Sequence, residues 1–595
     1  MPEAIRLIIT QPFLQRALVA GVLISLCAAL LGVSLVLKRF SMIGDGLSHV
    51  GFGALAIACA ANIAPLYFSL PIVVIAAFLL LRMSESGRIK GDAAIALIST
   101  GALAVGVMVT SLTTGMNVDI YNYMFGSILT MSNADVALSV VLSIAVLALY
   151  IVFYNEIFAV TFDESFSKAT GTKVSAYNML IAALTAVTIV IGMRMMGALL
   201  ISSLIIFPAV TSMRLCKSYR SVILTSAAVS VLCFFSGLLV SIRFEAPTGA
   251  SVVCVNIFAF GVFSLLRATV SSKLKTRAKR AISAFVAVVA AAAVFVVPLT
   301  GVVPVYEKKK ASVVATTFAP YDFSRQIAGE DAEVSMLLAP GEESHTFEPT
   351  AADIMKIESC DVFVYGGGES DEWVKSMLSS IDTSKISVVR MMDVTENLGE
   401  KTLEGMEQED EHGHDHGADG EYDEHVWTSP KNAEKIVLAI SKALCGRDTE
   451  NKENYEKRAE QYLEKLSALD KEFEALSKKA QGRHFVVGDR FPFMYLADEY
   501  SLEFYAAFPG CSAQSDANPT TIAFLSEKVR NEKIPVVYKV DLSTGAVAKS
   551  ISESTGAAVE TLWSCHVISA DDFKNGETYL SLMERNLKAL ENGCK

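Results

Sequence analysis

Three absences narrow the chemistry that this 595-residue chain can perform. No G-x-x-x-x-G-K-[ST] segment occurs, so the chain has no phosphate-binding loop of the usual kind with which to hydrolyse ATP. No H-E-x-x-H segment occurs either, which removes the commonest zinc-hydrolase motif. The 10 cysteines include no C-x-x-C pair, so neither a zinc ribbon nor a thioredoxin-like redox centre is predicted.

Charged residues are scarce, at 19% of the chain, and they are unevenly distributed. Residues 1–310 carry 23 Lys and Arg against 11 Asp and Glu, whereas residues 311–595 carry 28 against 52. The first part is apolar and weakly basic, which is typical of membrane helices joined by basic loops. The second part is acidic and repels polyanions, so nucleic acid is excluded as a partner.

Ten apolar runs in the first part are predicted to be helices in a membrane, which takes about 20 residues to cross. They are residues 17–37, 49–66, 70–82, 93–113, 134–154, 177–193, 197–213, 222–241, 250–266 and 281–304. Nine of these runs make up a predicted membrane domain, residues 1–272. The tenth lies in a predicted tethering helix and linker, residues 273–310.

Basic clusters set the predicted orientation of these helices. The clusters lie at residues 38–39, 82–90, 168–173, 214–220 and 267–280. Alternating crossings place all five clusters in the cytoplasm if the N-terminus is outside the cell. The same alternation predicts that everything after about residue 304 is extracytoplasmic.

Residues 311–595 are predicted to form an α/β domain of two lobes. Short, continuous apolar runs, typical of strands buried in parallel sheets, alternate there with helical stretches. The runs are residues 311–317, 360–365, 484–488, 535–540 and 558–563. Residues 448–481 have apolar residues at helical spacing and no Gly or Pro, so one helix of about 30 residues is predicted to join lobe 1 (about 311–447) to lobe 2 (about 482–595).

Seven of the eight histidines lie in the acidic part, where they are candidate metal ligands. Imidazole nitrogen and carboxylate oxygen are the usual zinc ligands. His345 and His425 each follow a turn, and Asp541 and His566 lie at or just past the carboxyl ends of later strands. Because ligands collect outside those strand ends in open α/β sheets, these four side chains form the candidate site, although each histidine alone also fits a surface or core position.

Two further groups are singled out by their residue types. His412, His414 and His416 alternate within an acidic segment, which indicates either an accessory metal-collecting loop or an ordinary solvated linker. Asp45 and His49 stand four residues apart at the start of an apolar run, so they would share a helix face. Ionisable residues at membrane depth line pathways or pair with each other, so this pair is predicted to belong to a membrane pathway, with interfacial caps as the alternative.

Four segments of the first part resemble the membrane permease of bacterial zinc and manganese ABC importers. They are residues 42–49 (MIGDGLSH), 162–171 (FDESFSKATG), 197–211 (GALLISSLIIFPAVT) and 246–250 (APTGA). The resemblance implies a multi-pass protein of the bacterial cytoplasmic membrane that forms a homodimer in the lipid bilayer. It also implies that residues 162–171 contact a separate cytoplasmic ATPase subunit.

Residues 311–595 resemble the solute-binding protein of the same importers, in which a metal lies between two α/β lobes joined by a long helix. The segments that carry this resemblance are residues 314–320 (VATTFAP), 340–349 (PGEESHTFEP), 424–433 (EHVWTSPKNA) and 579–587 (YLSLMERNL). The resemblance implies that His345 and His425 are the ligands from lobe 1. The histidine-rich loop is similar to that of zinc-selective members.

This sequence departs from the family at Arg490, where a His or Glu ligand is usual. A guanidinium stays protonated and cannot bind a cation, so either Asp489 substitutes or the third ligand comes from elsewhere. We predict that His566 is the third ligand and Asp541, at the family's acidic position, the fourth. The family's zinc members can carry a disulfide in lobe 2, here Cys511–Cys565, with two separate thiols as the alternative.

Together the resemblances predict a fused permease and binding component of an ATP-driven zinc importer, without enzymatic activity of its own. Zinc is the transported substrate, and no organic cofactor is expected. A manganese or iron importer is the nearest alternative, and the additional histidines argue against it. A membrane-anchored zinc sensor and a zinc hydrolase are alternatives of another class, and no catalytic motif supports the hydrolase.

Overall fold

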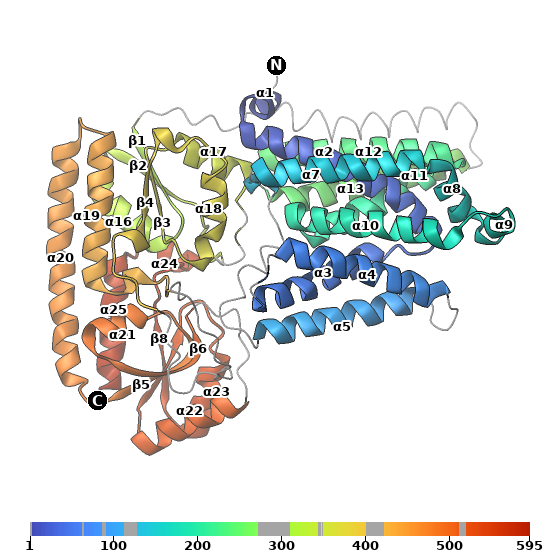
Figure 1. The fold of residues 1–595 in the computed structure, drawn as a ribbon. Helices are drawn as coiled ribbons and strands as arrows, with labels where there is room; N and C mark the ends of the chain where they lie inside the picture. Colours follow the sequence, from blue (N-terminus) through green and yellow to red (C-terminus); the bar gives the residue numbers. More distant parts are fainter. Residues whose placement is uncertain are drawn as a thin grey trace. The chain divides into compact units, whose positions relative to one another are not determined.

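The computed structural model (Figure 1) describes most of the chain. The described residues are 3–61, 63, 65–85, 91–111, 128–131, 133–244, 246–271, 310–342, 347, 349–399, 422–510 and 519–594. They divide into a first unit, mainly residues 1–305, and a second unit, mainly residues 306–595. The predicted tethering helix at 281–304 lies outside the described residues.

The described part of the first unit is helical. Its helices are α1 (Glu3–Thr10), α2 (Pro12–Leu37), α3 (Ile43–Ala60), α4 (Pro65–Glu85), α5 (Gly91–Ser111), η1 (Ile128–Thr130), α7 (Asn133–Val152), α8 (Tyr154–Phe162), α9 (Glu164–Ala169), α10 (Val174–Met196), α11 (Ala198–Met213), α12 (Tyr219–Phe244) and α13 (Thr248–Ser271). Each of the nine apolar runs predicted within residues 1–272 coincides with one of these helices, which confirms the helical prediction.

Five of these helices, α2, α7, α10, α12 and α13, are long and apolar enough to cross a membrane. Shorter apolar helices lie within α3, α4, α5 and α11. Length and composition thus agree with the predicted membrane domain, and the number of crossings stays a prediction.

Small residues let α2 pack closely against two other helices. A Cβ atom added to Gly32 would overlap the backbone carbonyl oxygen of Ile205 on α11. Ser226 and Ser230 on α12 donate hydrogen bonds of 3.3 and 3.0 Å to the carbonyl oxygens of Ala29 and Ser25. Close approach through glycine and hydroxyl contacts is how helices associate where lipid replaces water.

We expect Gly32→Ala to destabilise the first unit by about 1–3 kcal/mol, because the new methyl group meets backbone, which cannot rotate away. Gly101 on α5 provides the control, since an added Cβ there has no neighbour within 4 Å. Gly101→Ala is expected to be neutral or slightly stabilising. Thermal unfolding of the full chain in detergent compares the two variants, and equal melting temperatures would contradict the close packing of α2 on α11.

The second unit contains two parallel four-stranded sheets. The strands are β1 (Ala311–Ala315), β2 (Ala332–Met336), β3 (Val362–Tyr365), β4 (Ser387–Arg390), β5 (His484–Phe491), β6 (Glu503–Pro509), β7 (Val536–Val540) and β8 (Ala558–Leu562). Their orders are β2-β1-β3-β4 in the first lobe and β6-β5-β7-β8 in the second. In each sheet the next strand along the chain lies on one side of the first strand, β1 or β5, and the strand after that lies on its other side. Ligands of open α/β sheets bind at such points, outside the carboxyl ends of the strands.

Helices cover and connect these sheets. They are α16 (Phe318–Ala328), α17 (Ala351–Ser359), η4 (Glu369–Asp371), α18 (Glu372–Leu378), η5 (Thr383–Lys385), η6 (Met391–Asp393), η7 (Val426–Thr428), α19 (Pro430–Arg447), α20 (Lys452–Lys479), α21 (Met494–Tyr500), α22 (Pro519–Glu532), α23 (Ala546–Thr555), α24 (Ala570–Lys574) and α25 (Tyr579–Gly593). The α/β prediction for residues 311–595 is confirmed.

Helix α20 confirms the predicted long connection between the lobes (Figure 1). It has 28 residues and buries one stripe of aromatic and leucine side chains. That stripe includes Tyr455, Tyr462, Leu466, Phe473 and Leu476. The stripe belongs to the hydrophobic core that both lobes share, so α20 fixes one lobe against the other.

Candidate metal centre

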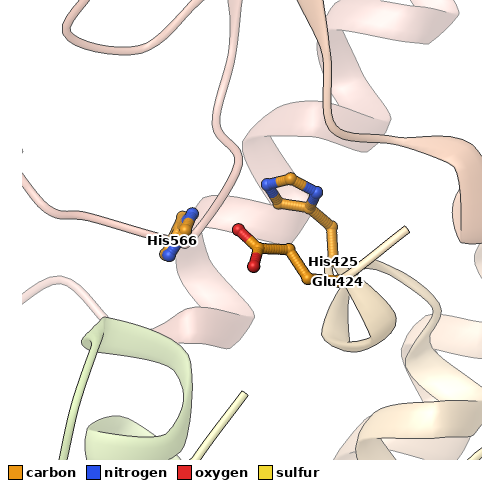
Figure 2. A group of neighbouring side chains, drawn as sticks. All are labelled: Glu424, His425 and His566. Carbon is orange, nitrogen blue, oxygen red and sulfur yellow. The ribbon is translucent and has the colours of Figure 1, made fainter. Parts of the chain in front are cut away.

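Three buried side chains of the second unit converge on one point (Figure 2). Glu424, His425 and His566 each offer one ligand atom, and these atoms all lie within 4.8 Å of one another. Glu424 and His425 immediately precede η7 in the first lobe, and His566 lies in the segment after β8 in the second. Two of the three predicted histidine ligands, His425 and His566, are 141 positions apart in the sequence but are neighbours in the fold.

The ring of His425 is oriented by Asp423. The Oδ1 atom of Asp423 accepts a hydrogen bond of 2.7 Å from the backbone N–H of His425 and lies 3.1 Å from its Nδ1 atom. Tyr495 in turn donates to the carbonyl oxygen of Asp423 at 2.8 Å. A carboxylate that accepts from Nδ1–H leaves the lone pair of Nε2 for a metal, which is the usual support for a histidine ligand.

His566 is held against the first lobe by its backbone and by Trp427. The N–H of Phe318 donates to the carbonyl oxygen of His566 at 3.0 Å. The Trp427 indole donates to the carbonyl oxygen of Ser564 at 2.9 Å, and its ring packs edge-on against both histidines, with centroid distances of 5.1 Å to His566 and 5.4 Å to His425. Because Trp427 is only 1% exposed, bulk water is kept away from this side of the imidazole rings.

The Glu424 carboxylate lies between the two imidazole rings in Figure 2. Its Oε2 atom accepts hydrogen bonds from the backbone N–H and the hydroxyl of Ser370, at 2.9 and 2.8 Å. Its Oε1 atom is buried and has no hydrogen-bond partner among the described residues. This side chain is thus half satisfied by the protein, with one oxygen left for another ligand.

A second acid, Asp371, lies in the same loop as Ser370. Its Oδ2 atom accepts from the N–H groups of Gly366 and Gly367, at 2.7 and 3.2 Å. Burial, together with the negative charge of Glu424, raises the pKa of Asp371 to about 7. Asp371 therefore holds its proton more strongly than an ordinary carboxyl group, which limits the negative charge beside Glu424.

Asp541, the predicted fourth ligand, and Asp489, the alternative to His566 as the third, lie outside this group of three. The Oδ1 atom of Asp541 accepts from the N–H of Ser564 at 2.9 Å, and desolvation raises the pKa of Asp541 to about 6. Asp489 accepts from the hydroxyl of Ser543 and, at 3.3 Å, from the N–H of Val540. Both carboxylates thus bond to the protein around β7, and their role as ligands stays a prediction.

Several other predicted residues lie outside the described part of the chain. These are His345, the loop histidines His412, His414 and His416, and Cys511. Cys565, the expected disulfide partner of Cys511, is buried directly after β8, and the disulfide stays a prediction.

In the first unit, Asp45 and His49 lie on α3, with Oδ2 and Nε2 3.6 Å apart. Their predicted common helix face is confirmed. The pathway that they would line stays a prediction.

Glu424 was not predicted from the sequence. It is one of several acids in the segment before His425, and adjacent residues in an extended chain point in different directions. The signal was its position: it opens the matched segment EHVWTSPKNA, next to a candidate ligand. The turn that leads into η7 is what brings both side chains to one point.

Two family comparisons cover most of the chain. Residues 313–593 match the family described as zinc-uptake complex component A, periplasmic, and residues 10–268 match the ABC 3 transport family.

Individual relatives align with the second unit. The zinc-binding lipoprotein AdcA of Streptococcus pneumoniae is 35% identical over 285 residues, which are 47% of this chain and 55% of that protein. The chain thus spans about half the length of these first relatives. The high-affinity zinc uptake system protein ZnuA of Bacillus subtilis is 32% identical over 282 residues, 47% of this chain and 86% of that protein. The crystal structure of Zn(II)-bound AdcA from Streptococcus pneumoniae has 32% identity and a TM-score of 0.41, over 48% of this chain and 58% of that one.

Proposed function

The chain belongs to the zinc-uptake complex component A family through residues 313–593 and to the ABC 3 transport family through residues 10–268, and we propose on this basis that it imports zinc. The second unit captures Zn²⁺ and passes it to the first unit, which conducts it across the membrane. A separate cytoplasmic ATPase supplies the energy. The observation that carries the proposal is the convergence of Glu424, His425 and His566.

The chemistry of this group favours zinc. The group combines two imidazole nitrogens, which are borderline-soft ligands, with a carboxylate oxygen, which is a hard ligand. Four-coordinate zinc sites typically have this combination, whereas manganese prefers oxygen-rich, six-coordinate sites. Asp423 supplies the supporting hydrogen bond that zinc-binding histidines usually have. All three ligand-bearing side chains are buried, which strengthens their attraction for a cation.

We include His345 as a further ligand from the first lobe. The turn before it is anchored beside the segment that carries His566, because the N–H of Gly341 donates to the carbonyl oxygen of Ile568 at 2.8 Å. His345 itself lies outside the described residues, so its role as a ligand rests on the family resemblance. With His345, His425, His566 and one carboxylate the site has the four ligands that zinc prefers.

The remaining assignments rest on the family resemblance and on charge. The membrane domain is proposed to span residues 1–272, followed by a tether at 273–310 and an extracytoplasmic binding domain at 311–595. Asp45 and His49 are proposed to line the zinc pathway. A homodimer of membrane domains, in the cytoplasmic membrane, completes the importer, and the loop histidines His412, His414 and His416 collect zinc for the main site.

The proposal is tested by metal titration of the purified full chain after its metal is removed with a chelator. Competition with an indicator of known affinity should reveal one tight zinc site, with weaker sites from the loop, and much weaker manganese binding. Zinc uptake into cells that express the chain with its ATPase should depend on that tight site. Equal affinity for manganese, or the absence of a tight zinc site, would contradict the proposal.

Zinc binding is also expected to stabilise the second unit against heat. A ligand that binds only the folded state at 100 times its dissociation constant adds about 2.7 kcal/mol to the free energy of unfolding. All three tryptophans, Trp373, Trp427 and Trp563, lie in the second unit, so the change in their fluorescence on heating monitors that unit in the full chain. A melting temperature that zinc does not raise, or that a chelator does not lower again, would contradict a site in this unit.

A further inference from the structure

The two oxygens of the Glu424 carboxylate have different surroundings, and this difference has a use if the site binds zinc as proposed above. We infer that Glu424 binds zinc through Oε1 alone, as the fourth ligand, and that Ser370 holds Oε2 so that the carboxylate does not chelate the metal with both oxygens. Ser370 is then a positioning residue that favours zinc over manganese.

The Oε1 atom requires a partner that the described residues do not supply. Glu424 is 1% exposed, and no hydrogen-bond donor in the described part of the chain reaches Oε1. A buried acceptor without a partner is costly, and a carboxylate oxygen more so than a neutral one. A cation at the point where the ligand atoms of His425 and His566 also converge satisfies this oxygen.

The Oε2 atom, in contrast, is already bound by two donors of Ser370. Gly368, two residues before Ser370, makes this contact possible, because a Cβ atom at this position would overlap the Cβ and Oε2 atoms of Glu424. The Asp371 carboxylate fixes the same loop through the N–H groups of Gly366 and Gly367. The loop from Gly366 to Asp371 therefore holds the Glu424 side chain from one side.

The number of carboxylate oxygens on the metal affects which metal fits. A single carboxylate oxygen beside the imidazole nitrogens keeps the number of ligands low, which suits four-coordinate zinc. A chelating carboxylate would add a fifth ligand and a second hard oxygen, and this change favours manganese. Rotating Glu424 into that position would break two hydrogen bonds from Ser370, one of them to a buried backbone N–H.

The same observations favour Glu424 over Asp541 as the acidic zinc ligand. Asp541 already accepts a hydrogen bond from the N–H of Ser564 and is not a member of the converging group. Glu424 offers a free oxygen inside that group.

The experiment compares Glu424→Gln, Asp541→Asn, Ser370→Ala and Ser370→Thr in the full chain. Zinc and manganese dissociation constants come from competition titrations, and absorption spectra of the Co²⁺-loaded chain report the coordination number, because four-coordinate Co²⁺ absorbs visible light far more strongly than six-coordinate Co²⁺. Thermal unfolding without metal identifies any variant that fails to fold.

We expect Glu424→Gln to weaken zinc binding by at least about 100-fold, because loss of a ligand costs more than loss of a supporting residue, and more than Asp541→Asn does. Ser370→Ala should weaken zinc binding about 10-fold and leave manganese binding unchanged or tighter. The visible absorption of its Co²⁺-loaded form should be weaker. Ser370→Thr should restore both the zinc affinity and the Co²⁺ absorption. The inference is overturned if Asp541→Asn costs more than Glu424→Gln, or if Ser370→Ala weakens both metals equally with an unchanged spectrum. A wild-type chain without tight zinc binding would instead refute the proposed function.

Discussion

Replacing His566 by alanine is expected to weaken zinc binding to the full chain by at least about 100-fold. Loss of a residue that merely supports a metal ligand costs about 10- to 100-fold in affinity, and loss of the ligand itself costs more. His566 lies in the converging group with Glu424 and His425. His425→Ala is expected to have an effect of the same size.

His484 provides the matched control for these substitutions. It is the first residue of β5, whereas the candidate site lies beyond the carboxyl ends of the strands. Its ring bonds to Glu532 at 2.7 Å and Glu503 at 3.0 Å and stacks on Tyr505. His484→Ala should therefore leave zinc affinity unchanged.

Competition titrations with zinc measure all three histidine variants. If His566→Ala retained full affinity, His566 would not be the third ligand. The position would then revert to Asp489, the other candidate from the sequence. If all three variants lost affinity equally, the effect would be one of folding and not of ligation.

Replacing Trp427 by alanine is expected to lower the free energy of unfolding of the second unit by about 3–5 kcal/mol. Trp427 is 1% exposed, and its indole N–H donates to the carbonyl oxygen of Ser564 in the other lobe. Truncation leaves a large cavity and an unpaired acceptor between the two lobes. It also removes the ring that packs against both histidines, so zinc binding should weaken as well.

Chemical unfolding of the metal-free full chain, followed by the fluorescence of the remaining tryptophans, measures this loss. Trp427→Phe keeps an aromatic ring and removes only the N–H donor and part of the volume, so its cost should be smaller. Trp563→Ala is the control for loss of a tryptophan, because Trp563 is only partly buried and lies over Arg585. Equal losses for Trp427→Ala and Trp563→Ala would contradict the bridging role of Trp427.

Most of the fold follows from patterns that are local in the sequence. Apolar runs and helical spacing predicted most of the described helices of the first unit and the long helix α20, because each such segment buries its own apolar face wherever it packs. The same reasoning found β1, β3, β5, β7 and β8. It missed β4 and β6. Strand β4 has only 4 residues, SVVR, so its apolar run is too short to stand out. Strand β6 contains a continuous apolar and buried run, residues 504–508, so its signal was present in the sequence.

The candidate site, like the fold, has one part that the sequence predicts and another that it does not. Residue type and position after a turn or a strand end were enough to choose His425 and His566, because only a few side chains have the lone pairs that zinc requires. The tertiary structure decided that these two residues are neighbours and that Glu424 joins them. It also decided that Asp541 and Asp489 form hydrogen bonds elsewhere. The meeting of His425 and Glu424 with His566 depends on contacts between the two lobes, such as those of Trp427 with Ser564 and of Phe318 with His566. The bonds of Asp541 and Asp489 lie within the second lobe. The sequence by itself determined which residues have the chemistry to bind zinc, whereas long-range packing decided which of their atoms meet, since a few ångströms of separation determine whether a carboxylate faces a metal or a backbone N–H.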